Sequence, residues 1–508
     1  MKRTKGFVSI FPKEQGMRKV FMSLIFPVSL VVFLSFSGTA SGATLYVGPG
    51  ETYTEIQPAI NAATNGDTII VRDGTYTGAN NKNLDFGGKS ITLKSENGPQ
   101  NTIIDCQGSG RGFYIYGGSP VVDGFTIRGG NVRELNPSSP EPYEWGGGFL
   151  CWSASPTITN CIITNNYAHR GGGIDCYHAS PLISNCTISG NVAESGYGGG
   201  INVSYGSPSI KNCMITNNTA TWLSLGGGIA LYESSSQIIN CTISGNVAGT
   251  HGYENYGSGG AIFVINSNIT ITNCILWDNS AFYGPEMRVR WATATIQYSD
   301  INPAYVSILP GTVNWGDGNI NADPLFVGGG DYHLQELSPC VDAGTDAGVD
   351  TDIDGDARPY DVPNWNKDGT GDEFDMGADE FAPPCLYEFY GFIEPLPFEE
   401  SGEVRTYKSN RVIPVKFKLY DSFGTEITSL SEPPVISILY AGSGDAGGNP
   451  TEYDVTGQAD DGNTFRYSEE NWIFNLSMRS FTINCDYDII VTIPETGCTH
   501  QVRIHLVK

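Results

Sequence analysis

The sequence is poor in basic residues. Lys and Arg together account for 28 of its 508 residues, against 54 Asp and Glu, and the formal net charge at neutral pH is −26. Such an acidic surface repels the phosphate backbone of nucleic acids and lacks the basic stripe that nucleic-acid binding requires. We therefore exclude DNA and RNA as partners and expect neutral or cationic ligands.

Long hydrophobic runs are confined to the first 43 residues. Basic residues there precede an apolar run from Val20 to about Phe36, and small residues follow up to Ala43. This order is typical of a secretory signal peptide, whereas the alternative, a membrane anchor, is disfavoured because Pro27 and several serines interrupt the run. Cleavage near Ala43 removes a net charge of +5 and leaves −31. We expect a secreted or cell-surface protein without a membrane span after cleavage.

Helical periodicity is almost absent, while glycine is abundant, with 64 residues. Short β-branched segments such as TITNCIIT (157–164) alternate with turn-forming residues, which is typical of an all-β protein. The chain is also longer than a single hydrophobic core usually supports. We therefore expect several β-rich domains.

Five copies of one unit occupy the middle of the chain, at spacings of 25, 27, 28 and 33 residues. In each unit an Asn directly precedes a Cys, a second Asn follows the Cys by five positions, and an Ala follows it by seven. Three glycines, or Ser-Gly-Gly at 258–260, close the interval to the next unit. Such a period is typical of a solenoid. The repeated cysteines are Cys161, Cys186, Cys213, Cys241 and Cys274.

If each repeat forms one coil, parallel strands stack about 4.8 Å apart and equivalent residues lie above one another. Stacked Asn side chains then form hydrogen-bonded ladders, while Cys and Ala fill the interior. The repeated residues are therefore predicted to be structural. Weaker segments on both sides extend the array to about nine coils, and Ile56, Ile60 and Ala63, at helical spacing, predict a short helix that caps its first coil.

These features resemble a known architecture. Residues 44 to about 300, opening with YVGPGETYTEIQPAINAATNGDTIIVRDGTYTG (46–78), resemble a right-handed parallel β-helix of the pectin-lyase-like class. The segments ADPLFVGGGDYHLQELSPCVDAG (322–344) and DMGADEF (375–381) resemble the end module of secreted β-helix proteins of the choice-of-anchor type. The resemblance implies an architecture rather than an activity, because one fold hosts many functions.

The end module is rich in alternating acidic residues. DTDIDGDARPYD (350–361) and NWNKDGTGDEFD (364–375) each place oxygen-bearing side chains at alternate positions around a central Gly, as calcium loops do. Both loops have Asp instead of Glu at position 12 and lack flanking helices, and the alternative is a solvated acidic turn capped by Arg358. We expect structural calcium, with candidate ligands Asp350, Asp352, Asp354, Asp356, Asp361, Asn364, Asn366, Asp368, Asp372 and Asp375.

The last part of the chain has alternating strand patterns suited to a β-sandwich. IPVKFKL (413–419) and WIFNL (472–476) resemble the small immunoglobulin-like module called the PxKF domain. Cys485 and Cys498 flank a strand and turn, which favours a disulfide, and Cys340 with Cys385 is a weaker pair. The predicted domains are a signal peptide (1–43), a β-helix (44–320), the end module (321–382) and a sandwich (383–508).

Outward positions after the glycines suggest a ligand site. Stacked coils would gather aromatic rings and acids into one exposed strip, and such a surface suits sugars because the apolar sugar face stacks while the hydroxyls bond to the acids. The alternative is an ordinary solvent-facing sheet. The candidate residues are Trp152, Asp175, Tyr177, His178, Tyr205, Tyr232 and Glu233.

Catalysis has weaker support in the sequence. A hydrolase of this fold would need paired Asp residues on neighbouring coils, but the coil after Asp175 offers Asn202. A lyase would need a basic residue in the strip, which contains no Lys. Only Asp175, His178 and Glu233 are weak catalytic candidates. We therefore expect a monomeric, non-catalytic protein that binds glycans or partner proteins in adhesion or in the extracellular matrix; the alternative is a polysaccharide lyase or glycoside hydrolase.

Overall fold

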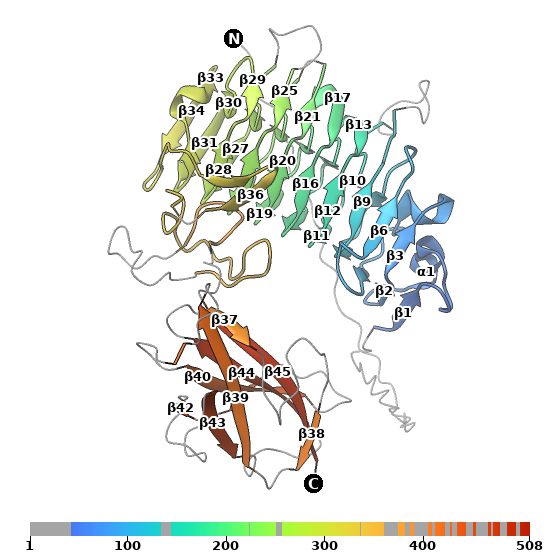
Figure 1. The fold of residues 1–508 in the computed structure, drawn as a ribbon. Helices are drawn as coiled ribbons and strands as arrows, with labels where there is room; N and C mark the ends of the chain where they lie inside the picture. Colours follow the sequence, from blue (N-terminus) through green and yellow to red (C-terminus); the bar gives the residue numbers. More distant parts are fainter. Residues whose placement is uncertain are drawn as a thin grey trace, which may run out of the picture. The chain divides into compact units, whose positions relative to one another are not determined.

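The computed structural model describes residues 42–133, 144–222, 224–249, 257–335, 337–359 and 374–381, together with nine strands and three single residues of the last 127 (Figure 1). Residues 1–41 of the predicted signal peptide lie outside this part. Within it, no helix has the length and apolar character that crossing a membrane requires.

A short helix, α1 (Ile56–Ala62), stands at the N-terminal end of the coils. Its buried residues Ile56, Ala59 and Ile60 form part of the interior. The helix contacts β1 (Thr44–Val47), β2 (Thr68–Val71) and β4 (Leu84–Asp85). The Ile56 amide donates to Asn81 Oδ1 at 2.8 Å, in the 3-10 helix η1 (Ala79–Asn81). The predicted cap helix is confirmed.

Three long parallel sheets, named A, B and C here, form the walls of the solenoid, and Figure 1 shows their strands following one another coil by coil. Sheet A contains β1 (Thr44–Val47), β2 (Thr68–Val71), β5 (Thr92–Ser95), β8 (Val121–Asp123), β11 (Thr157–Thr159), β15 (Leu182–Ser184), β19 (Ser209–Lys211), β23 (Gln237–Ile239), β27 (Asn268–Thr272), β31 (Ala292–Gln297) and β34 (Gly311–Trp315).

Sheets B and C have nine strands each. Sheet B contains β3 (Gly74–Tyr76), β6 (Thr102–Asp105), β9 (Thr126–Arg128), β12 (Ile162–Thr164), β16 (Thr187–Ser189), β20 (Met214–Thr216), β24 (Thr242–Ser244), β28 (Ile275–Trp277) and β32 (Asp300–Ile301). Sheet C contains β4 (Leu84–Asp85), β7 (Phe113–Tyr116), β10 (Phe149–Trp152), β14 (Ile174–Tyr177), β18 (Ile201–Ser204), β22 (Ile229–Tyr232), β26 (Ile262–Ile265), β30 (Met287–Arg290) and β33 (Val306–Ile308).

Nine coils therefore contribute one strand to each of the three sheets, and sheet A gains one further strand at each end, which agrees with the prediction of about nine coils. A fourth, shorter parallel sheet, D, follows sheet B along the repeated coils. It contains β13 (Tyr167–Arg170), β17 (Val192–Tyr197), β21 (Thr219–Ala220), β25 (Val247–Ala248) and β29 (Ser280–Ala281). The 3-10 helix η2 (Pro303–Tyr305) precedes β33.

The interior of the coils is apolar and contains the repeated cysteines. These five cysteines, with Cys151 and Cys176, are buried and free, as the repeat predicted. The thiols donate to backbone carbonyls, for example Cys186 Sγ to Ser184 O at 3.1 Å. Burial raises the pKa of the Cys161 thiol, so this sulfur remains protonated and acts as a small core residue.

Asparagine forms two ladders, both predicted from the repeat. In the inner ladder, each Nδ2 donates to Oδ1 of the Asn in the next coil at 3.0–3.1 Å, through the buried residues Asn166, Asn191, Asn218, Asn246 and Asn279. The outer ladder joins Asn160, Asn185 and Asn212, directly before the cysteines. These outer residues have left-handed φ values of 52°, which Asn tolerates in a bend.

Each glycine triplet separates sheet D from sheet C. Its first glycine is left-handed, as at Gly198 (φ 61°), and a Cβ on the second, Gly199, would lie 2.4 Å from Gly227 O of the next coil. The strand register corrects one sequence alignment, because Ile229 pairs with Ile262. The segment equivalent to Gly226–Gly228 is therefore Gly259-Gly260-Ala261, not Ser258-Gly259-Gly260.

The acidic end module packs on the coils around sheet B. A hairpin of β35 (Phe326–Gly328) and β36 (Asp331–Leu334) opens it, and Leu334, Cys340 and Met376 form a buried cluster with Ile275 of β28. Asn273 exchanges hydrogen bonds with the Thr345 backbone, at 3.0 Å for the bond that Asn273 Oδ1 accepts. The module therefore shares its small core with the β-helix.

The described strands of residues 383–508 form two sheets. One contains β37 (Tyr387–Tyr390), β39 (Val412–Asp421), β43 (Asn471–Ser477) and β42 (Arg466–Ser468); the other contains β38 (Arg405–Lys408), β45 (Cys498–Val507), β44 (Cys485–Ile493), β40 (Val435–Gly442) and β41 (Thr451–Tyr453). The predicted sandwich and its immunoglobulin-like resemblance stay predictions.

Both predicted disulfides are wrong. The hairpin register pairs Cys498 with Ile493, whereas Cys485 lies eight residues further along β44, opposite Leu506. That separation is about 26 Å at the usual strand rise, far beyond the reach of a disulfide. Cys340 carries a free, buried thiol that donates to Asp300 Oδ2 at 3.5 Å, so it is not paired with Cys385.

Candidate functional site

Sheet C brings most of the predicted ligand residues together. Trp152, Tyr177, Ser204 and Tyr232 are successive partners in its register, and Tyr116 precedes them on β7. Ser204 interrupts this column, but Tyr205 follows it at the corner and fills the gap. We call Tyr116, Trp152, Tyr177, Tyr205 and Tyr232 the aromatic strip.

The rings of the aromatic strip contact one another without a break. Centroids lie 6.4 Å apart from Tyr116 to Trp152, 5.6 Å from Trp152 to Tyr177, 5.7 Å from Tyr177 to Tyr205 and 5.2 Å from Tyr205 to Tyr232, with interplanar angles of 74–87°. Edge-to-face contacts of this kind are favourable and fix the rings. Tyr116 is 57% exposed and Tyr205 40%, so these two offer the most ring surface to a ligand.

Asp175 does not belong to the exposed surface, which corrects the prediction. Its side chain is fully buried: Arg170 Nε donates to Oδ2 at 3.0 Å, and Asn202 Nδ2 donates to the same oxygen at 2.9 Å. Burial raises the pKa of this carboxyl, and the Arg170 guanidinium opposes that rise. The prediction missed that Arg170, from β13, would reach over the glycines and cover it.

Trp145 is a member of the site that the sequence analysis missed. Its ring is 3% exposed, lies 5.4 Å from the Tyr177 ring, and has the Arg170 guanidinium carbon 3.5 Å above its centre. Trp145 directly precedes a glycine triplet, Gly146–Gly148, and that position was the available signal. Trp145 thus contacts the rings of Trp152 and Tyr177, and Arg170 contacts the ring of Tyr177.

His178 and Glu233 lie at the corner after sheet C and are exposed, as predicted. Both have left-handed backbones, with φ 49°. The His178 ring stacks on Tyr205 with centroids 4.9 Å apart, and hydrogen bonds with Tyr205 and Glu233 raise the pKa of Tyr232. His178 and Glu233 thus make their contacts with aromatic side chains. General acid–base catalysis instead requires an acid and a base placed on either side of a substrate.

The predicted calcium ligands fall into separate groups. Asp361, Asn364, Asn366, Asp368 and Asp372 lie outside the described residues, and Asp350 and Asp356 are exposed. Asp352 is buried, and its oxygens accept from the amides of Asp354, Asp356 and Glu380 at 2.8–3.2 Å. Asp375 accepts from the amides of Asp342 and Phe381.

Arg358 is buried and holds this turn against the 374–381 segment. Its guanidinium lies 3.3 Å from a Glu380 oxygen and donates to the Gly377 carbonyl at 3.0 Å. The Arg358 side chain thus binds the 374–381 segment and not the carboxylates of its own turn, and the calcium loop stays a prediction.

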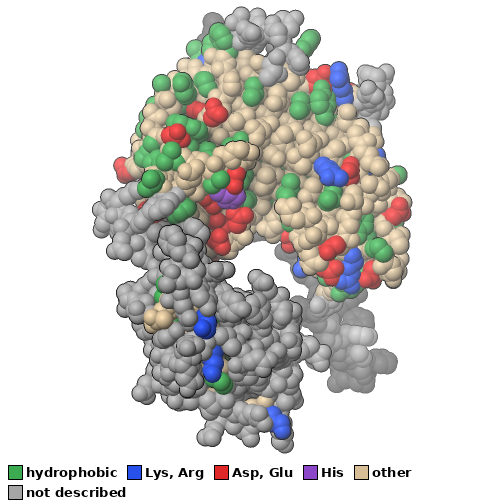
Figure 2. All heavy atoms as spheres, in the orientation of Figure 1, with side chains coloured by type: hydrophobic (Ala, Val, Ile, Leu, Met, Phe, Trp, Pro, Cys, Tyr) green, Lys and Arg blue, Asp and Glu red, His purple; other side chains and the backbone are tan. Residues whose placement is uncertain are grey.

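Asp354 is directed toward a histidine that the sequence analysis did not single out. His333 Nε2 lies 2.7 Å from Asp354 Oδ2, and His333, Asp354 and Asp379 place one potential metal-ligating atom each within 4.8 Å of one another. Figure 2 shows acidic side chains gathered around a histidine near β36. The hydrogen bond with Asp354 raises the pKa of His333 to about 10, and burial raises the pKa of Asp379 to about 6.

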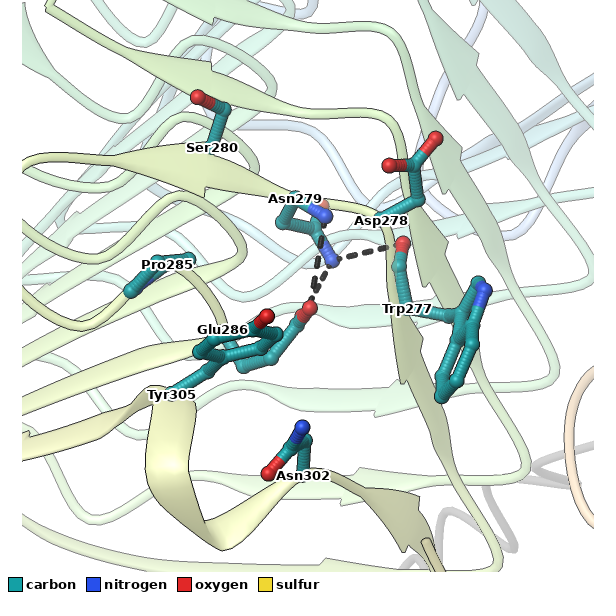
Figure 3. A pocket seen from close by; sticks show the side chains of 8 residues that line it. All are labelled: Trp277, Asp278, Asn279, Ser280, Pro285, Glu286, Asn302 and Tyr305. Atoms are coloured by element: carbon teal, nitrogen blue, oxygen red, sulfur yellow. Dashed lines mark hydrogen bonds between the residues drawn. The ribbon is translucent and has the colours of Figure 1, made fainter. Parts of the chain in front are cut away.

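A cavity of about 370 Å³ lies near the last repeated coil (Figure 3). Trp277, Asp278, Glu286 and Tyr305 are among its lining residues. Glu286 is 2% exposed and its Oε2 accepts from Asn279 Nδ2 at 2.7 Å, so it takes the place of the next Asn in the inner ladder. Burial raises the pKa of Glu286 to about 7.

Comparison with protein families agrees with this architecture. Residues 61–246 match the family model described as the right handed beta helix region. No curated protein matches the chain. The match and the stacked parallel sheets establish a right-handed parallel β-helix solenoid and support the pectin-lyase-like fold.

Proposed function

We propose that this protein binds glycans along the aromatic strip without transforming them, as a secreted or cell-surface protein. The observation that carries the proposal is the unbroken contact of five aromatic rings over neighbouring coils of sheet C. A regular array of rings matches a polymer with repeated rings better than it matches a small, single ligand. Stacking removes the apolar face of each sugar from water, and the hydroxyl groups remain free to hydrogen bond.

The surroundings of the strip favour a neutral or cationic glycan. Glu233 is exposed beside Tyr205 and Tyr232, and the chain is strongly acidic overall. Asp175 and Arg170 neutralise each other beneath the surface, so their pair gives rigidity instead of a charged contact. An anionic polysaccharide would be repelled by the net charge of the protein.

The described geometry does not favour Asp175 as a catalytic residue. Asp175 is buried, and its oxygens are occupied by Arg170 and Asn202, so it cannot reach a glycosidic oxygen or a water. A binding surface explains the rigid rings without requiring an acid and a base.

Hydrolysis of a glycan is the second candidate, and it is favoured by Glu286 alone. A carboxyl with a pKa of about 7, beside a cavity lined by Trp277 and Tyr305, has the protonation state of a general acid. Against it, the oxygens of Glu286 accept from Asn279, and the inner ladder explains that contact structurally. If the protein releases reducing ends from a glycan and Glu286→Gln abolishes this release, the protein is a hydrolase.

The binding proposal is tested with Tyr116→Ala, Tyr205→Ala and their double variant. Each single substitution should weaken binding to a retained neutral polysaccharide about tenfold, corresponding to about 1.4 kcal/mol. Affinity electrophoresis against a polysaccharide panel gives the ranking, and titration calorimetry gives the affinity. Trp222→Ala is the matched control, because Trp222 is 60% exposed but belongs to a segment outside the strip.

The proposal is overturned if no polysaccharide in the panel is retained, or if retention is equal in the double variant and the wild type. Assays for reducing ends and for unsaturated products run in parallel on each retained polysaccharide. Product formation would replace binding by catalysis as the function of the molecule.

A further inference from the structure

Three side chains with metal-ligating atoms converge from three separate segments of the end module. His333 lies on β36, Asp354 in the acidic turn, and Asp379 in the 374–381 segment. Their ligating atoms all lie within 4.8 Å of one another, close enough for all three to bind a single ion. Because the three segments are distant in sequence, a bound ion would tie the module together.

A fourth residue, outside this group, orients the histidine. Asp331 Oδ1 accepts from His333 Nδ1, so Nε2 is the ring nitrogen that faces Asp354. A carboxylate on the opposite nitrogen is the usual second partner of a metal-binding histidine, since it fixes the ring and makes the ligating nitrogen more basic.

A backbone amide holds the Asp379 carboxylate in place, and a hydrogen bond to Asp352 fixes the backbone of the turn at Asp354. Asp379 Oδ2 accepts from the Leu334 amide at 2.6 Å, and the Asp354 amide donates to Asp352 Oδ1 at 3.0 Å. Asp379 is also buried, at 6% exposed, in a setting already rich in negative charge. A cation would relieve the repulsion between Asp379 and Asp354.

We propose that His333, Asp354 and Asp379 form a binding site for a divalent transition-metal ion such as Zn²⁺. Three protein ligands of nitrogen and oxygen leave one tetrahedral position for water. Calcium prefers six to eight oxygen ligands, and imidazole suits zinc and related metals. The calcium loop expected from the sequence is less favoured because the Asp352 oxygens are already engaged by three backbone amides. On binding, the metal displaces the proton that lies between His333 Nε2 and the Asp354 carboxylate, and this proton is released to the solvent.

The test uses the full-length mature protein, freed of metal by chelation. Titration with Zn²⁺ should show one site per chain and should raise the melting temperature, and Co²⁺ should give the visible absorption of a tetrahedral site. His333→Ala should abolish all three signals. Asp331→Asn, which changes a positioning residue, should weaken Zn²⁺ binding 10- to 100-fold without removing it.

His169→Ala is the matched control, because it removes a histidine from sheet D and should leave Zn²⁺ binding unchanged. Zn²⁺ binding that persists in His333→Ala overturns the proposal. A melting response to Ca²⁺ but not to Zn²⁺, equal in wild type and His333→Ala, overturns it in favour of an oxygen-only calcium loop. No response to either ion also overturns it and leaves the cluster as an ion-paired network. None of these outcomes depends on glycan binding.

Discussion

Asparagine has two separate roles within each repeat. The Asn directly before Cys provides a left-handed bend, as at the buried Asn212 (φ 52°). The Asn five positions after Cys is buried and is hydrogen-bonded to the coils on both sides. Asn218 illustrates the second role. Its Oδ1 accepts from the Asn191 amide and Nδ2, and its own Nδ2 donates to Ile188 O and Asn246 Oδ1.

We predict that Asn218→Ala lowers the free energy of unfolding by at least about 3 kcal/mol, because buried donors and acceptors on two coils lose their partners. Asn212→Gly, which keeps the left-handed bend, should cost no more than about 2 kcal/mol. Urea denaturation measures both. Equal losses in the free energy of unfolding would contradict a larger contribution of the inner ladder to stability.

The buried carboxyl of Glu286 should make the stability of the protein depend on pH. Its carboxyl has a pKa of about 7 in the folded protein, against an ordinary value of 4.5, so between these values the folded protein keeps a proton that the unfolded chain has released. Stability therefore falls as pH rises from about 4.5 to 7, and the loss of about 3 kcal/mol is complete above pH 7.

Glu286→Gln should remove this part of the pH dependence, because glutamine accepts from Asn279 without ionising. The variant should match the wild type near pH 4.5 and be more stable at pH 8, by up to about 3 kcal/mol. Denaturation midpoints of the variant and the wild type, measured at pH 4.5 and pH 8, test this expectation. A variant that is less stable than the wild type at pH 8 would contradict the assigned shift.

At the scale of elements, glycine sets how closely coils can stack. Gly199 has an ordinary backbone, yet a Cβ would lie 2.4 Å from Gly227 O and 2.6 Å from the Thr219 carbonyl carbon. At Gly198–Gly200, where the chain passes from sheet D to sheet C, the next coil therefore leaves no space for a side chain on Gly199. Gly98 differs, since it is left-handed (φ 83°) with open space around its Cβ position.

We predict that Gly199→Ala costs about 3 kcal/mol or more, because the backbone of the next coil must move. Gly98→Ala should cost only about 1–2 kcal/mol, the strain of a left-handed alanine. Thermal unfolding of the two variants provides the comparison. Similar losses would mean that close stacking is not the reason for the triplet.

At the scale of the whole molecule, the end module packs on sheet B through a small hydrophobic cluster that is separate from the interior of the coils. Met376 is fully buried in the cluster that contains Ile275, and the next residue, Gly377, donates to Asn273 O at 2.8 Å. The Ala378 amide donates to Thr242 Oγ1 at 3.0 Å. Sheet B is thus covered by a segment that lies 136 residues beyond Thr242 in the chain.

Met376→Ala should cost about 2–5 kcal/mol and loosen the 374–381 segment from sheet B. Limited proteolysis should then cut the end module earlier than in the wild type. Leu337→Ala is the matched control, because Leu337 belongs to the same module but is 76% exposed. If cleavage in Met376→Ala is unchanged, the hydrogen bonds between the 374–381 segment and sheet B are enough to hold the end module in place.

The sequence by itself determined the solenoid, its coil number, its cap helix and both asparagine ladders, because a short repeat stacked in register brings identical residues into contact. The same logic placed Trp152, Tyr177, Tyr205 and Tyr232 in one strip. Only the tertiary structure decided that Arg170 covers Asp175 and that His333 meets Asp354. Those contacts join side chains across a corner or between distant segments, where no periodic rule fixes the geometry. The failed Cys485 and Cys498 pair has the same cause, since spacing along the chain does not fix hairpin register.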